Sequence, residues 1–288
     1  MKDLQLFSMK FSIVTPNYNY GRFLQKALES VFAQVEEPGA PEIEHIVIDG
    51  ASTDESVPIL KRWDSFVRDT AAAKESRYSF QFISEPDKGQ TDAINKGLRR
   101  ATGDVVAWLN ADEWYLPGKL ARVADAFARH PKADFIYGEP LYVDGEGKPL
   151  RIKRDHPFSR FVLLHYGCYI ASCCSFWRRR ILDDGQYLDP SYKVVMDGEY
   201  WARICREGYR FRFLPATVAA FAWHDGNVSL EFDARRREEE HGILVRYGRI
   251  PAWSVPIMKA VSHRWRQMLV LGRLLIFPCE TVEGIIHG

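Results

Sequence analysis

Short apolar runs that alternate with helical segments constrain the fold of this chain more than any other feature. Between the runs, apolar residues recur with the 3.6-residue spacing of one helix face, most clearly over residues 90–101. Runs this uniformly apolar are typical of strands buried on both faces. The pattern predicts an α/β fold with a Rossmann-like, mostly parallel central sheet and helices on both faces. The predicted strands are residues 11–15, 45–50, 78–83, 105–109 and 134–137.

The pattern changes after about residue 138. Residues 141–152 have the alternation and central glycines of a hairpin, and a helix near 197–207 and a strand over 209–221 follow. We therefore expect one domain over residues 1–228, with halves at about 9–138 and 139–228. A C-terminal helical extension is expected over residues 229–288.

Composition excludes several classes of protein. The net charge is +1, so no overall field draws the chain to nucleic acid. The five cysteines include no CxxC pair, which indicates reduced thiols in the cytoplasm and neither a disulfide framework nor a zinc site. Residues 1–10 lack the apolar core of a signal peptide, and no uncharged run reaches membrane-spanning length.

Polar residues follow the predicted strands at the edge where an open parallel sheet binds ligands. The clearest case is the sequence Asn110-Ala111-Asp112-Glu113, directly after the run 105–109. Its carboxylates suit a hard cation such as Mg²⁺ or Mn²⁺. The alternative is that Asp112 and Glu113 cap the next helix, which Pro117 is predicted to open.

Four segments occur in an order that resembles the inverting family 2 glycosyltransferases of GT-A fold. They are IVTPNYNYGRFLQKALESVFAQ, EHIVIDGASTDES, SEPDKGQTDAINKGLRRATGDVVAWLNADEWYLPG and MDGEYWARI, and the resemblance covers residues 9–228. It implies metal-dependent transfer of a sugar from a nucleoside-diphosphate sugar to a hydroxyl of a glycan or lipid-linked acceptor. Such a reaction belongs to EC class 2.4 and serves surface polysaccharide or glycoconjugate synthesis. The first half would bind the nucleotide sugar and the second the acceptor.

The resemblance also implies roles for individual residues. Asp49 would accept a hydrogen bond from the nucleobase, and Asp197 would be the catalytic base. Asn110-Ala111-Asp112 would be the counterpart of the Asp-x-Asp motif, with Mn²⁺ or Mg²⁺ as cofactor. The implied nucleotide-sugar contacts are Thr15, Pro16, Asn17, Tyr18, Asp49, Asp87, Lys88, Asp92, Asn110 and Ala111, and the implied metal ligands are Asp112, Glu113 and His224.

Several interpretations stay open at this stage. Asn110 departs from the motif because it brings no charge, which leaves Asp112 as the main ligand. An inactive nucleotide-sugar-binding relative that acts as an interaction subunit is therefore the alternative function. His224 is either a ligand or structural, and Trp201 is either an acceptor platform or a core residue. Glu199 and Arg203 have the spacing of a surface ion pair. A dehydrogenase is excluded, because no GxGxxG follows the first strand.

Residues 254–277 interleave basic and apolar side chains. Lys259, His263, Arg266 and Arg273 fall on one side of the predicted helix, and Arg264 lies at its flank. Such a helix suits a membrane surface, which would make the protein peripheral at the inner face of the membrane. Alternatively, it packs on the catalytic domain or on a second subunit, as in a homo-oligomer. The predicted apolar face contains Met258, Val261, Trp265, Met268, Leu269 and Ile276.

Overall fold

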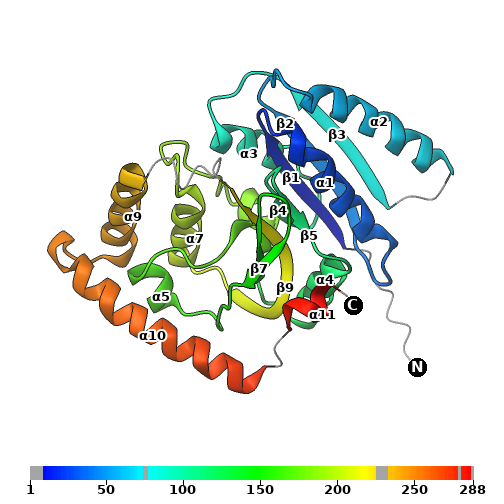
Figure 1. Cartoon of the computed structure of the whole chain (residues 1–288). Coiled ribbons are helices and arrows are strands. Elements are labelled where there is room, and N and C mark those ends of the chain that lie inside the picture. Colours follow the sequence, from blue (N-terminus) through cyan, green and yellow to red (C-terminus); the bar gives the residue numbers. More distant parts are fainter. Residues whose placement is uncertain (1–8, 74–76, 225–232, 278–279, 287–288) are drawn as a thin grey trace.

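A computed structural model describes residues 9–73, 77–224, 233–277 and 280–286. It confirms the predicted α/β class: a nine-stranded sheet is surrounded by helices (Figure 1). The strand order is β3-β2-β1-β4-β8-β6-β9-β5, and β7 pairs with the C-terminal part of β6, at residues 141–143. Cys279, one of the five cysteines, lies outside the described residues.

The first half forms the parallel part of the sheet. Each of its strands pairs in parallel with its neighbour, in the order β3-β2-β1-β4. Asp54 accepts a hydrogen bond from the backbone N–H of Ser56 at 2.9 Å and so caps the start of the helix that follows β2. The elements are β1 (Lys10–Asn17), α1 (Gly21–Phe32), a 3₁₀ turn (Ala33–Glu36), β2 (Glu42–Asp49), α2 (Ser56–Ala73), β3 (Tyr78–Ser84), α3 (Gln90–Leu98) and β4 (Val105–Trp108).

The second half is mixed. The predicted hairpin forms from β6 and β7, whereas β6 and β9 pair in parallel. Two strands and two short helices (β5, β8, α5 and α6) escaped prediction because each is only three to six residues long. The elements are β5 (Glu113–Tyr115), α4 (Lys119–Arg129), β6 (Phe135–Asp144), β7 (Pro149–Ile152), α5 (Arg160–His165), a 3₁₀ turn (Ser172–Cys174), β8 (Ser175–Arg178), α6 (Arg180–Asp183), α7 (Met196–Arg206) and β9 (Phe211–Trp223).

The sheet curls back on itself. β4 lies in the middle of the strand order and β5 at its end, yet only residues 109–112 connect them. That connection spans at most about 18 Å, since consecutive Cα atoms lie about 3.8 Å apart. The end of the sheet therefore returns to its middle, and the polar residues 110–113 lie at this junction.

Aromatic packing fills the core between the sheet and α7. Trp201 of α7 is fully buried and stacks on Trp108 of β4, with ring centroids 5.3 Å apart and an interplanar angle of 11°. Trp177 of β8 meets both rings edge to face. Trp201 is thus a core residue, and the core alternative was the correct one.

Two long helices follow β9 (Figure 1): α9 (Asp233–Gly248) and α10 (Val255–Ile276), with a 3₁₀ turn (Ala252–Ser254) between them and a short α11 (Val282–Ile286) after them. α9 packs on α5 and α7, and α10 packs mainly on α5. None of the helices in the described part of the chain is long and apolar enough to cross a membrane.

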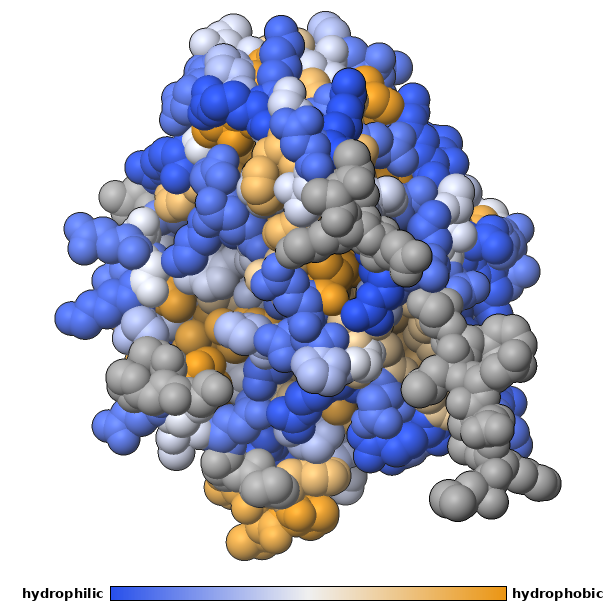
Figure 2. Space-filling view, turned by 90° about the vertical axis from the view of Figure 1, so that its right-hand side faces the viewer, coloured by the Kyte–Doolittle hydropathy of each residue, from blue (hydrophilic) through white to orange (hydrophobic). Residues whose placement is uncertain are grey.

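The contacts of α10 show which of its faces meets the protein. Arg273 is only 1% exposed and forms an ion pair with Glu139 at 3.0 Å, and Arg266 pairs with Asp155 at 3.2 Å. Both arginines, which the sequence placed opposite the apolar face, thus face the protein, because they pair with buried carboxylates of the β6–β7 region. Figure 2 shows hydrophobic side chains gathered at the foot of the molecule, at the height where α10 ends in Figure 1. The exposed apolar residues of this region are Trp253, Ile257, Val261, Trp265, Met268, Leu271, Leu274, Leu275 and Ile276, which we call the outer face of α10.

Candidate active site

A cavity of about 850 Å³ opens at the carboxyl ends of β1, β2 and β4. This is the edge at which the sequence predicted ligand binding. Both halves of the chain contribute to it, and so does α9. The predicted site residues that line it are Pro16, Asn17, Tyr18, Asp87, Asn110, Ala111, Asp112, Glu113 and Asp197.

Hydrogen bonds join the two loops that form one wall of this cavity. The Asn17 side-chain amide donates to Asp49 at 2.7 Å, and the Asn19 backbone N–H donates to the Ser52 hydroxyl at 2.8 Å. Asn19 also accepts from the backbone N–H of Thr53 at 2.8 Å. Asn19 has a φ of 56°, a left-handed conformation that asparagine tolerates well. These polar residues therefore fix the shape of the wall before any ligand binds.

Four predicted nucleotide-sugar contacts do not line the cavity. The Thr15 hydroxyl bonds to the buried ring of His45 at 2.9 Å, because alternate residues of a strand point to opposite faces. The Asp49 carboxylate is buried behind the wall, where Asn17, Ser52 and Ser84 donate to it. The other two are Lys88 and Asp92, at the start of α3, where the backbone N–H of Lys88 donates to the Asp92 carboxylate at 3.1 Å.

Glu113 closes the turn after β4. Its Oε2 accepts the backbone N–H of Asn110 at 2.9 Å, and its own N–H donates to the Asn110 carbonyl at 3.0 Å. Burial raises the pKa of Glu113, and the neighbouring Asp112 carboxylate raises it further. Neither acid caps α4, whose N-cap is Gly118 with no side-chain hydrogen bond, so the capping alternative was wrong. Glu113 shapes the turn that presents Asp112.

Asp112 meets His224 across the curl of the sheet. Its Oδ2 lies 3.0 Å from the Nε2 of His224, and the imidazole stacks on Phe23 with ring centroids 4.8 Å apart. Neighbouring ligands of an octahedral ion with bonds of about 2.1 Å are themselves roughly 3 Å apart. The contact is a hydrogen bond, and the same two side chains would supply two ligands to a divalent cation, although the described residues contain no group of three or more metal-binding side chains. Diphosphate oxygens and water suit the other positions.

Asp197 lies in the first turn of α7 and lines the same cavity. The backbone N–H of Gly198 donates to its Oδ1 at 2.7 Å, and the Cys168 thiol lies 3.9 Å from its Oδ2. Burial raises the pKa of Asp197 to about 6, and the negative charge of Glu240 acts in the same direction. A carboxylate with this pKa is ionised at neutral pH yet binds a proton more readily than an ordinary aspartate, as a general base requires.

Glu199, two residues further on, points elsewhere, because residues two apart on a helix do not share a face. It pairs with Arg203 at 2.8 Å, but it is only 1% exposed and also accepts from the Tyr247 hydroxyl of α9. The predicted ion pair therefore exists, but the prediction that it lies on the surface was wrong. The reason is α9, whose packing on α7 covers it.

Aromatic and charged residues that the sequence analysis missed complete the cavity. Tyr142, Phe221 and Trp223 line it from β6 and β9, and Arg236 and Glu240 line it from α9. Phe221 and Trp223 are two apart on one strand, so they share a face. That spacing is the signal that could have identified them. Nothing in the local sequence of α9 indicates that this helix lies at the cavity.

Sequence comparisons relate this chain to a known protein family. A sequence model described as glycosyl transferase family 2 matches residues 12–185. An uncharacterized glycosyltransferase of Nostoc sp. is 28% identical over 202 residues, which cover 66% of this chain and 58% of that protein. The uncharacterized glycosyltransferase YwdF of Bacillus subtilis is 26% identical over 253 residues, which cover 82% of this chain and 85% of that protein. The chain thus spans less than two thirds of the Nostoc protein's length.

Two solved structures are similar in fold. Staphylococcus aureus TarS (residues 1–349), in complex with UDP-GlcNAc, has a TM-score of 0.59 at 18% identity. That comparison covers 83% of this chain and 71% of the solved TarS fragment. The mannosyltransferase PcManGT from Pyrobaculum calidifontis, in complex with GDP-Man and Mn²⁺, has a TM-score of 0.59 at 17% identity. It covers 95% of this chain and 77% of that protein.

Proposed function

This chain belongs to glycosyl transferase family 2 and has the GT-A fold, and on that premise we propose that it is a metal-dependent inverting glycosyltransferase. It transfers a sugar from a nucleoside-diphosphate sugar to a hydroxyl of a glycan or lipid-linked acceptor, in surface polysaccharide or glycoconjugate synthesis. One observation carries the proposal. A single cavity contains Asp112, paired with His224, in one wall and Asp197, with a raised pKa, in another.

The donor is expected on the side of β1, β2 and β4. Asn17, Tyr18 and Asp87 offer polar groups for the nucleotide there, and Gly50 leaves room between Tyr18 and Asp87. The relatives solved with UDP-GlcNAc and GDP-Man support a nucleoside-diphosphate sugar as the donor class. A divalent cation bound by Asp112 and His224 would offset the negative charge of the departing diphosphate.

The acceptor is expected between Asp197 and the aromatic residues of the second half. Tyr142, Phe221 and Trp223 offer flat apolar surfaces to a sugar ring. Asp197 removes the proton of the acceptor hydroxyl as that oxygen attacks the anomeric carbon. The attack comes from the face opposite to the leaving diphosphate, so the anomeric configuration inverts.

We also propose that the outer face of α10 rests on an anionic lipid surface. Trp253, Trp265 and Leu275 are 76%, 47% and 89% exposed, a large apolar area for a surface in water. Residues 255–276 contain no Asp or Glu, while His263 and Arg264 are exposed beside the apolar side chains. Tryptophan and basic residues are the groups that helices at membrane interfaces use. This placement would bring the cavity near lipid-linked acceptors at the inner face of the membrane.

The direct test is donor turnover with and without Asp112. The protein is incubated with a panel of UDP- and GDP-sugars and Mn²⁺, and slow donor hydrolysis identifies the donor. Asp112→Asn should then lower turnover by about 10²-fold or more, since charge stabilisation by a metal is worth several kcal/mol. Asp125→Asn, which changes an exposed acid on α4, is the matched control.

Two outcomes would count against this function. Near wild-type turnover of Asp112→Asn, with an unchanged Mn²⁺ response, would contradict the metal assignment. Donor binding without hydrolysis or transfer for every sugar tested would favour the inactive relative.

A further inference from the structure

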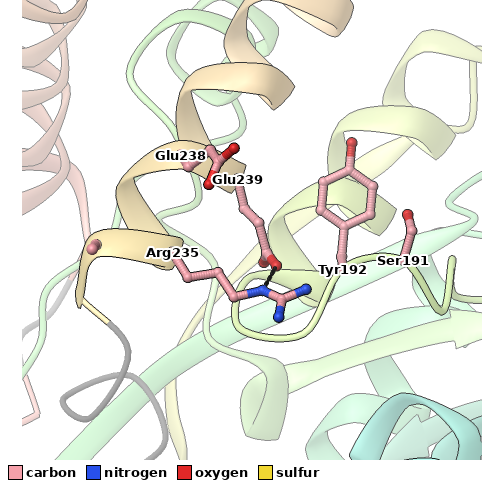
Figure 3. A pocket seen from close by; sticks show the side chains of 6 residues that line it. Ser191, Tyr192, Arg235, Glu238 and Glu239 are labelled. Atoms are coloured by element: carbon pink, nitrogen blue, oxygen red, sulfur yellow. Dashed lines mark hydrogen bonds and ion pairs between the residues drawn. The ribbon is translucent and has the colours of Figure 1, made fainter.

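A carboxylate from α9 holds the segment that leads into α7. The Oε1 of Glu239 accepts the backbone N–H of Lys193 at 3.0 Å. Its Oε2 accepts the N–H groups of Val194 and Val195 at 3.0 and 3.1 Å. In Figure 3, Glu239 points from its helix toward the loop that carries Tyr192. One side chain thus binds three successive backbone donors, and we call this arrangement the Glu239 clamp.

The clamp satisfies donors that would otherwise need other partners. The first N–H groups of a helix and the residues before it have no acceptor within that helix. Burial alone would raise the pKa of Glu239, but hydrogen bonds from the segment and from Arg235 keep it below its usual range. The carboxylate is therefore ionised at neutral pH, and its bonds are of the stronger, charge-assisted kind.

The clamped segment is part of the cavity. Val194, Val195 and Met196 line it, and Asp197 follows directly. A change in the backbone at 193–195 therefore alters the direction in which the Asp197 carboxylate points. The donor side of the cavity comes from other loops, at residues 16–18, 86–90 and 110–113.

We propose that Glu239 is a positioning residue for sugar transfer. It fixes segment 193–195 and so holds Asp197 against the acceptor hydroxyl, without contacting either substrate. The inference rests on the proposed role of Asp197 as the base. It assigns a function to α9, which lies outside the stretch 12–185 that the family model matches.

The docking of α9 does not depend on this one side chain. Tyr247 donates to Glu199 at 2.5 Å, and Ile243 and Tyr247 belong to the same core cluster as α7. Arg235 pairs with Glu239 at 2.9 Å (Figure 3), but its side chain is 49% exposed, and such pairs contribute little. Loss of the clamp should loosen the segment while the fold persists.

The test uses three variants of the full chain. Glu239→Ala removes all three bonds and should lower kcat about 10²-fold, the cost of a misplacement of about 1 Å. Glu239→Gln has one carbonyl oxygen, which can still accept from Val194 and Val195, so its kcat should lie in between. Arg235→Gln, the matched control, removes the ion pair but leaves the clamp, and its kcat should stay near wild type.

Two further measurements separate positioning from binding and from stability. Nucleotide affinity, measured by calorimetry with UDP and GDP, should stay within about twofold of wild type, since Glu239 bonds the backbone of 193–195 and none of the donor loops. Lys193 meets the donor loop through its side-chain amine, 3.4 Å from the Lys88 carbonyl, and Glu239 does not hold that amine. Hydrogen exchange should show faster exchange of the amides at 193–195 in Glu239→Ala, with little change elsewhere. This second measurement does not require an active enzyme.

Several results would overturn the inference. An active wild type with an equally active Glu239→Ala variant excludes a positioning role while leaving the proposed function intact. Loss of nucleotide affinity in proportion to kcat would make Glu239 a binding residue. Unchanged amide exchange at 193–195 would show that the clamp does not hold the segment. A wild type that transfers no sugar would end the proposed function first, and this inference with it.

Discussion

At Asp197, burial raises the pKa of the carboxylate, which suits its proposed role as general base and lowers the stability of the folded protein at neutral pH. The carboxylate lies among Cys168, Gly198 and the charge of Glu240, and its pKa is raised from 3.8 to about 6. The folded protein therefore binds this proton more tightly than the unfolded chain does. Ionisation of Asp197 costs stability as the pH rises from about 3.8 to 6, and that cost is fully present at neutral pH.

Asp197→Asn should therefore separate activity from stability. It keeps the shape of the side chain but cannot take a proton, so transfer should fall by about 10² to 10⁴-fold. In wild type, kcat/KM should decline below pH 6, because only the ionised carboxylate acts as the base. The variant should unfold at a higher temperature than wild type at neutral pH, as measured by calorimetry.

Two results would contradict the role of Asp197 as the base. One is a wild-type profile that stays flat from neutral pH down to pH 5. The other is an Asn variant that loses nucleotide affinity together with turnover.

At the scale of single residues, the sequence revealed chemistry better than orientation. Asp112 stood out because it is a polar residue directly after an apolar run, whereas Asp197 was indicated by the family resemblance alone. That the Thr15 side chain meets His45 depends on the face of the sheet on which it lies and on the register of β1 with β2, and local sequence does not specify either. The same holds for Glu199, which is buried by Tyr247, far away in the chain.

At the scale of elements, α10 carries its buried charges inward and its apolar side chains outward. Lipid association should therefore depend on the outer face alone. Replacing Met268 and Leu275 with Ser should weaken binding to anionic vesicles without loss of stability, since both side chains are exposed. Leu150→Ser, which changes an exposed apolar residue on β7, is the matched control.

Charge gives an independent test of the same surface. Arg264→Glu should reduce binding to anionic vesicles at low salt, because each basic residue near such a surface contributes roughly 1 kcal/mol. Co-sedimentation with anionic and neutral vesicles at two salt concentrations measures both effects. The contrary result is that the unsubstituted protein does not bind vesicles and that the Met268 and Leu275 substitutions change its mass in sedimentation velocity. In that case a second copy of the chain covers this face.

The amphipathic pattern of residues 254–277 predicted the helix correctly and left open which of its faces meets the protein. Apolar spacing shows that a helix has two unlike faces and does not show which one meets the protein. Here Glu139 and Asp155, distant in sequence, supply the partners that draw Arg273 and Arg266 inward. Predicting that arrangement requires knowing which buried carboxylates need partners.

At the scale of the whole molecule, the Arg273–Glu139 pair connects the C-terminal helix to the central sheet. Both side chains are almost completely buried, and Arg154 also pairs with Glu139 at 2.8 Å. Removing one partner of a buried pair costs about 3–5 kcal/mol, because the other charge stays buried. Arg273→Ala should lower the free energy of unfolding by about 3 kcal/mol in a urea titration, since Arg154 still compensates part of the charge.

Arg264→Ala, on the exposed side of the same helix, should change this free energy by less than about 0.5 kcal/mol. Equal effects of the two substitutions would contradict the inward orientation of α10. A chain cut at residue 252 would lose Arg266 and Arg273 and leave their buried partners unpaired with them, so it should be unstable. Such a fragment is therefore unsuitable for testing lipid binding.

The curl of the sheet also sets the order in which the molecule can be completed. β5 pairs with β9, so a nascent chain that has just exposed Asp112 has no partner for the strand that follows. His224, which hydrogen-bonds to Asp112, is synthesised only after β9. Such non-local pairing slows folding and leaves strand edges open in the meantime. A fragment that keeps all of residues 12–185 should thus be an unfinished sheet prone to aggregation, and not a smaller enzyme.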